Sequence, residues 1–258
     1  MSFQEISLVS LSGIYALAAP VFLYYRKRMS KKKNPQDHSK KRILEFIAFN
    51  LALNSVAYFG FMLIFLEIIT KPGITFTIPL LLLSAFFLLA TGITFYGSGI
   101  YITSVITDTF TPKQLRKIPY LRRQSIAIDM FHGPISHIIM FSGAIVAGAL
   151  LCILDLTTGP TLDSLPRLLL VSGAIMGLSM GYSQITNGTA PYQTITGIVS
   201  VIALFVLDKL QGWEFTSSPI GVYMIGFILT FVLLDIYFIT FHWKFQNLWG
   251  RSGYREYT

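Results

Sequence analysis

Residues 220–241 read IGVYMIGFILTFVLLDIYFITF, and this stretch decides the fold. Asp235 is its only acidic or basic residue, and roughly 20 apolar residues suffice for a helix to cross the hydrocarbon core of a bilayer. The whole chain is similar in character, with 53% hydrophobic and 12% charged residues, whereas charged residues make up about a quarter of a soluble domain. The sequence therefore predicts an integral membrane protein.

Other apolar runs extend this pattern over the chain between short polar segments. With the stretch above, they predict an all-α bundle of about seven transmembrane helices, at 5–25, 43–69, 75–105, 125–154, 168–185, 192–207 and 220–241. The runs 75–105 and 125–154 are longer than a span requires, so we expect these helices to tilt or to extend into water. No linker divides the chain, and we expect residues 1–258 to form one membrane domain.

The basic residues predict the orientation of the chain. Although the net charge is +8, the Lys and Arg residues gather in the loops 26–42 and 113–123 and near the end of the chain, which argues against a nucleic-acid surface. Basic loops mark the cytoplasmic side, whereas Asp155, Asp163 and Glu214 fall in the opposite loops. Seven spans then place the amino terminus outside and the carboxyl terminus in the cytoplasm.

A few polar residues within the spans are the candidates for function, because such groups are costly in a bilayer. Asp235 stands out most, since burial in an apolar run favours the neutral carboxylic acid, which can donate a proton. A hydrogen bond that ties the last span to a neighbour is the structural alternative. Asn50 and Asn54 lie four residues apart and share one helix face, where they could line a polar path or hold helices together.

Asp129, His132 and His137 form a second polar group, which raises the question of a metal or haem site. His132 and His137 differ by five positions, which places them about 140° apart on a straight helix. Gly133-Pro134 lies between them and can distort the helix enough to bring them closer. Because the chain has only two other histidines, we expect neither a metal nor another cofactor.

The last third of the chain resembles the fungal integral-membrane terpene cyclases of meroterpenoid and indole-diterpene pathways. The similarity includes Pro219-Ile220-Gly221-Val222-Tyr223, the run 231–235 that ends in Asp235, and the aromatic and basic exit 241–245. The segments 167–173 and 213–215 are similar in character to the fifth helix and the last outer loop of that family. The resemblance implies a seven-span enzyme of the endoplasmic reticulum membrane that works without metal or diphosphate chemistry.

The chain departs from this family in its second span, where Asn50-Leu51-Ala52-Leu53-Asn54 stands in place of Asn-x-Ala-x-Glu. An amide cannot deliver a proton, so Asn54 would orient the substrate, or Asp129 or Glu45 would supply a second carboxyl group. The resemblance implies Asp235 as the general acid, Asn54 as its partner across the bundle and Asn50 in support. Asp129 and His132 are candidates for the terminating base, and Tyr58 and Tyr237 for an aromatic lining that stabilises a carbocation.

The resemblance implies a membrane-bound terpene cyclase that protonates an epoxide or alkene of a prenyl chain and guides cyclisation of the resulting cation, and the residues suit this chemistry. The expected substrate is a lipophilic prenylated molecule, and the resemblance implies an epoxidase upstream in the pathway. A proton-coupled transporter or channel is the alternative, in which Asp235, Asp129 and His137 would form a relay through the bundle.

Overall fold

The computed structural model describes residues 2–30, 40–110, 118–159 and 166–242, and no strand occurs among them. The helices are α1 (Phe3–Ser30), α2 (Lys40–Ile69), α3 (Ile78–Phe110), α4 (Pro119–Met130), α5 (Ser136–Thr157), α6 (Pro166–Asn187), α7 (Ala190–Gln211) and α8 (Pro219–His242). A π-helix, η3 (Phe131–Ile135), joins α4 directly to α5, and a 3₁₀ turn, η4 (Phe215–Ser217), precedes α8. The prediction of an all-helical protein is confirmed for this part of the chain.

Six helical segments in the described chain are long and apolar enough to cross a membrane. They are Ile47–Ile69, Ile78–Thr107, Ile126–Thr157, Pro166–Ile185, Ala190–Gln211 and Pro219–Phe241. Each overlaps one of the predicted spans from the second to the seventh. The described apolar part of α1, Phe3–Ala18, is shorter. The structure therefore supports an integral membrane protein with six clear candidate spans.

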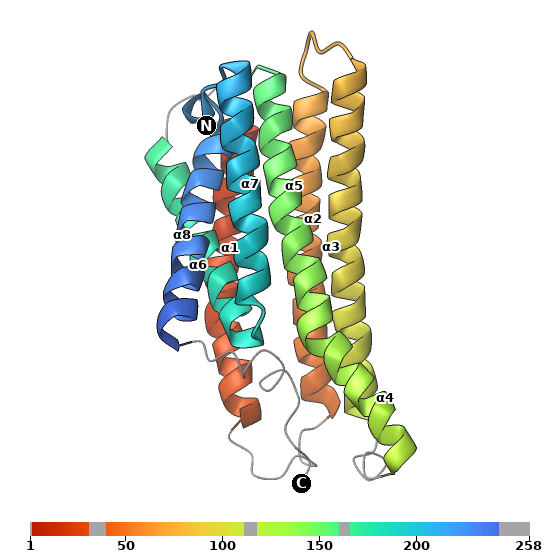
Figure 1. The fold of residues 1–258 in the computed structure, drawn as a ribbon. Helices are drawn as coiled ribbons and strands as arrows, with labels where there is room; N and C mark the ends of the chain where they lie inside the picture. Colours follow the sequence, from red (N-terminus) through yellow and green to blue (C-terminus); the bar gives the residue numbers. More distant parts are fainter. Residues whose placement is uncertain (1, 31–39, 111–117, 160–165, 243–258) are drawn as a thin grey trace.

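The long helices lie side by side and alternate in direction along the chain (Figure 1). Helix α1 begins at the end of the bundle drawn at the top of Figure 1, which we call the amino-terminal end, and α8 runs from there to the opposite end. The unit α4, η3 and α5 forms one long bent rod that returns to the amino-terminal end. The candidate spans thus cross the same layer repeatedly, as a polytopic bundle requires.

Glycines allow α6 and α8 to pack in unusually close parallel contact. A Cβ atom at Gly173 would collide with the carbonyl oxygen of Tyr223, and one at Gly177 with that of Phe227. From the other side, Gly226 lies against the carbonyl oxygen of Leu170. Small residues spaced by four are the usual means of close helix approach in membranes, where the hydrophobic effect does not drive helices together. These glycines fix the register of α8, and hence the position of Asp235, relative to α6.

Apolar side chains also cover much of the outer surface of the bundle. Large side chains on α3, including Leu81, Phe86 and Leu89, are more than half exposed. Soluble monomers rarely present continuous apolar surfaces of this kind. The exposed faces are therefore suited to contact with lipid, while Phe87 and Phe231 fill the interior.

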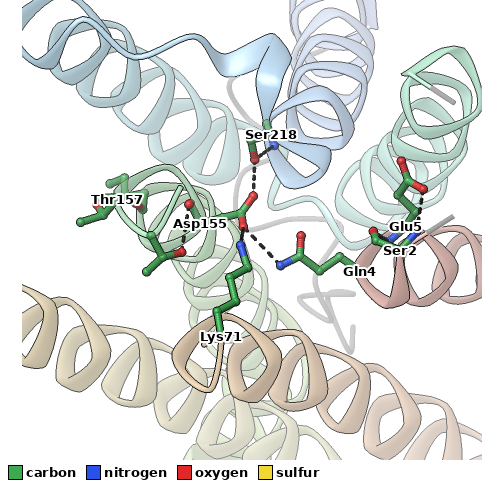
Figure 2. A network of polar contacts seen from close by, with 10 residues as sticks. Ser2, Gln4, Glu5, Lys71, Asp155, Thr157 and Ser218 are labelled. Carbon is green, nitrogen blue, oxygen red and sulfur yellow. Dashed lines mark hydrogen bonds and ion pairs between the residues drawn. The ribbon is translucent and has the colours of Figure 1, made fainter. Parts of the chain in front are cut away.

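The amino-terminal end of the bundle is held by a polar network around Asp155 of α5, a fully buried residue (Figure 2). Its Oδ1 atom lies 3.0 Å from Lys71 Nζ and accepts a 3.2 Å hydrogen bond from Gln4 Nε2. Its Oδ2 atom accepts a 2.6 Å hydrogen bond from Ser218 Oγ. The sequence pattern placed Asp155 in an outer loop, which is wrong, because its partners allow the carboxylate to be buried within a helix. We call these four residues the Asp155 network.

Candidate functional site

Asp235 lies two thirds of the way along α8 and is fully buried. Its Oδ2 atom lies 3.2 Å from Thr194 Oγ1 on α7, whereas Oδ1 has no hydrogen-bond partner. The two helices approach closely because Gly197, one turn beyond Thr194, leaves room for the Phe231 ring. A buried polar atom without a hydrogen-bond partner lowers the stability of the fold, so such atoms are rare and often belong to functional sites.

Gln184 of α6 is a second buried polar residue in this part of the bundle. It is fully buried, and neither Oε1 nor Nε2 has a partner. Gly181, one turn earlier, packs against Phe231 and Leu234, and α6 and α8 run parallel. One further turn along both helices therefore brings Gln184 to the level of Asp235.

Thr189 and Gln193 extend the unpartnered group around the start of α7. Thr189 donates its backbone N–H to the Gln184 carbonyl oxygen, but its buried Oγ1 atom has no partner. Gln193 Nε2 donates a 3.2 Å hydrogen bond to the His137 carbonyl oxygen, whereas Gln193 Oε1 is buried without one. We call Gln184, Thr189, Gln193 and Asp235 the α6–α7–α8 polar cluster; all four are fully buried.

The π-helix η3 contains Gly133-Pro134, the pair expected to distort this helix. A π-helix stacks residues five apart, whereas a straight α-helix would separate them by about 140°. His132 and His137 accordingly pack on the same ring, that of Tyr101 on α3, with centroids 5.3 and 5.1 Å away. Both histidines therefore contact the same aromatic ring of α3.

The hydrogen bonds of His137 fix which ring nitrogen carries a proton in the neutral form. His137 Nδ1 lies 2.7 Å from the Gly133 carbonyl oxygen, and a carbonyl oxygen can only accept. Nδ1 must therefore be the donor, which leaves the lone pair on Nε2. His132 differs, because its Nδ1 atom is buried with no partner. His137 thus offers a basic nitrogen, and its carbonyl oxygen connects to the polar cluster through Gln193.

The asparagines expected to assist Asp235 lie on α2, and no hydrogen bond joins Asn54 to Asp235 in the described structure. Helix α1 packs against both α2 and α8 and so separates them. Asn50 is buried and Asn54 is partly buried. The expected direct pairing across the bundle is therefore not formed, because another helix fills the space between the two spans.

The other expected site residues are spread over the bundle. Tyr58 of α2 is buried, bonded to Ser98 Oγ at 3.1 Å and stacked on Phe95. Asp129 is partly buried just before η3, on the same rod as His132. Tyr237 is 54% exposed, and its position two residues after Asp235 turns it away from the buried face of α8.

A groove of about 430 Å³ runs along α3, α4 and η3, outside the polar cluster. Its lining is mostly apolar, with Tyr96, Ile100 and Phe131 among its residues. Ile100 and Phe131 directly precede Tyr101 and His132 in the chain. The groove therefore lies beside the histidine group.

Within the described residues, no group of three or more His, Cys, Asp or Glu side chains is arranged to hold a metal ion. Comparisons of the chain with protein-family models, curated proteins and solved structures give no match. Function must therefore be argued from the cluster itself. Sequence reasoning selected Asp235 but missed Gln184, Thr189, Gln193 and Thr194, which the packing of α6, α7 and α8 brings together.

Proposed function

We propose that this protein is a membrane-bound terpene cyclase in which Asp235 is the general acid. The observation that carries the proposal is the state of its carboxyl group, which is fully buried with one oxygen on Thr194 and the other unpartnered. A structural carboxylate buried in a bilayer would need partners for both oxygens. An acid that must meet a substrate needs one oxygen left available.

The hydrogen bonds of Thr194 favour the neutral form of this acid. Thr194 Oγ1 lies 2.8 Å from the Ala190 carbonyl oxygen and 3.2 Å from Asp235 Oδ2, yet a hydroxyl group has one proton. Both contacts are hydrogen bonds at once only when Asp235 is protonated and donates to Thr194, while Thr194 donates to Ala190. The carboxyl group would then be neutral, with its proton on Oδ2 in the hydrogen bond to Thr194.

In the proposed reaction, the Asp235 proton is transferred to an epoxide oxygen or to an alkene carbon of a prenyl chain. The carbon–oxygen bond or the π bond breaks, and the resulting carbocation is attacked by the next alkene to close a ring. Loss of a proton to a base ends the cascade, so that the product is an isomer of the substrate. The candidate bases are His137, whose backbone carbonyl oxygen accepts from Gln193, and His132, which packs on the same Tyr101 ring; Asp129 lies on the same rod.

The proposal includes a topology and a cellular location. It takes α1 as a seventh span, the amino-terminal end of the bundle as the lumenal side, and the basic loops 26–42 and 113–123 as cytoplasmic. The membrane would be that of the endoplasmic reticulum, and the substrate a prenylated molecule supplied by an epoxidase. The groove beside η3 would give such a substrate an approach from the bilayer.

The direct test is a product assay in microsomes that contain the full chain. A panel of prenylated aromatic compounds with terminal epoxides is supplied, and cyclised isomers of unchanged mass are sought by liquid chromatography and mass spectrometry. We expect a product with the wild type and none with Asp235→Asn. Asp208→Asn, which changes an aspartate at the far end of α7, is the matched control and should retain product. Unchanged product with Asp235→Asn would reject the mechanism.

A proton-coupled transporter is the second candidate, and one observation favours it. Asp235 contacts Thr194, the adjacent Gln193 bonds to His137, and His137 packs on Tyr101, so polar groups follow one another from α8 through α7 and α5 to α3. Such a line of groups is typical of proton relays. Reconstitution into liposomes with an internal pH dye tests this function: proton uptake that requires both Asp235 and His137 would favour transport over cyclisation.

A further inference from the structure

The α6–α7–α8 polar cluster contains more unpartnered polar atoms than an acid alone requires. Besides Asp235 Oδ1, these are both amide atoms of Gln184, Gln193 Oε1 and Thr189 Oγ1. All four residues are fully buried. Most buried polar groups in proteins are hydrogen-bonded, so several orphans in one region indicate a missing partner.

The geometry places these residues in one region of the bundle. Asp235 contacts α7 through Thr194, which directly follows Gln193. Gln184 accepts the backbone hydrogen bond of Thr189 and lies one turn beyond the Gly181 contact with Leu234. These contacts place the four residues on α6, α7 and α8 in neighbouring turns of the bundle.

The chemistry of the unpartnered atoms specifies the missing group. The carbonyl oxygens of Gln184 and Gln193 can only accept hydrogen bonds, and Gln184 Nε2 can only donate. A partner must therefore both donate and accept, as a hydroxyl group does and an ether or a hydrocarbon does not. Around the cluster, Met180, Phe231 and Leu234 provide apolar surface for the remainder of a ligand.

We infer that Gln184, Thr189 and Gln193 form, beside Asp235, a buried binding site for the hydroxyl group of a lipophilic alcohol or phenol, which leaves Asp235 free to act as the acid. The inference rests on the proposed function, because it assigns a hydroxyl-bearing prenyl compound as the substrate class. Gln184 is the principal specificity residue, since its amide offers an unpartnered donor and an unpartnered acceptor on two separate atoms. Water is the competing occupant, and the experiment separates the two.

The test uses the full chain in detergent, with farnesol and farnesyl methyl ether as probes. The two compounds share one isoprenoid chain, but only the alcohol can donate a hydrogen bond. We expect farnesol to raise the thermal unfolding midpoint of the wild type and to bind at least tenfold more tightly than the ether. Gln184→Leu should raise the midpoint without ligand, because an unpaired buried amide is removed, and should abolish the farnesol effect.

Controls separate a binding site from a structural role. Gln211→Leu, at the exposed end of α7, should retain the farnesol effect, and Gln184→Met should behave as Gln184→Leu if the leucine variant fails to fold. Equal stabilisation by both probes, no stabilisation by either, or a lower ligand-free midpoint in both Gln184 variants would overturn the inference. A lower midpoint would indicate an amide already bonded to structural water.

The outcomes also separate this inference from the proposed function. Farnesol binding that depends on Gln184, together with no cyclised product from any substrate, would retain the binding site and reject the cyclase. Product formation that is unaffected by Gln184→Leu would retain the cyclase and reject the binding site.

Discussion

Asp155 and Asp235, the two aspartates that are fully buried in the described part of the chain, differ in how their oxygens are satisfied. Asp155, at the amino-terminal end of the bundle, has partners for both oxygens in Lys71, Gln4 and Ser218. Asp235, nearer the opposite end, has a contact for one oxygen and none for the other. Burial alone therefore does not mark a functional carboxyl group, whereas burial with an incomplete set of partners does. We interpret Asp155 as structural and Asp235 as functional.

The largest expected effect comes from breaking the Asp155 network with Asp155→Asn. This change leaves the Lys71 ammonium without its counter-charge and places an amide N–H₂ among donors. Loss of one partner of a buried ion pair costs about 3 kcal/mol. We expect a large fall in the thermal unfolding midpoint in detergent, followed by the fluorescence of the purified protein. A midpoint equal to that of the wild type would contradict the structural role of Asp155.

A smaller loss is expected from Ser218→Ala. Ser218 Oγ donates to Asp155 and accepts a 2.9 Å hydrogen bond from the Gly221 backbone N–H, so it also caps the start of α8. Loss of a cap and of one hydrogen bond to a charged group costs about 1 to 2 kcal/mol. The same unfolding assay measures this loss. Ser217→Ala is the control, because the Ser217 hydroxyl group donates only to the nearby Glu214 carbonyl oxygen.

The sequence predicted the helices and singled out Asp235 because those features follow from local composition. It did not predict the Asp155 network, because the partners lie 151, 84 and 63 residues away along the chain. Gln184 was missed for another reason: it lies at the end of the apolar run 168–185, where a polar residue is ordinary. The signal that could have pointed to Gln184 is its depth: an amide side chain in the sixth helix at the same level of the bundle as Asp235.

Thr194→Val sharpens the comparison with a change that preserves side-chain shape. Removal of the hydroxyl group leaves both Asp235 oxygens without a partner, at a cost of about 1 kcal/mol. We expect a modest fall in the unfolding midpoint. The amount of product should fall more, since the hydrogen bond that positions the Asp235 carboxyl group is lost. Thr194→Ser, which retains the hydroxyl group, should recover product. A serine variant no better than valine would show that the hydroxyl group is not involved.

The smallest effect on stability is expected from Asp235→Asn. An asparagine amide can donate to Thr194 as the neutral acid does, and no counter-charge is left behind. The free energy of unfolding should change by less than about 1 kcal/mol, although product is lost. This result would be opposite to that for Asp155→Asn, which should lower stability and reduce product only in proportion to the folded protein.

The most direct measurement is therefore a paired one, in which Asp155→Asn and Asp235→Asn are compared for unfolding midpoint and for cyclised product per folded molecule. Our account predicts that the first variant loses stability but retains product per folded molecule, while the second retains stability and forms no product. Loss of stability in Asp235→Asn comparable to that in Asp155→Asn, with product per folded molecule unchanged, would contradict it.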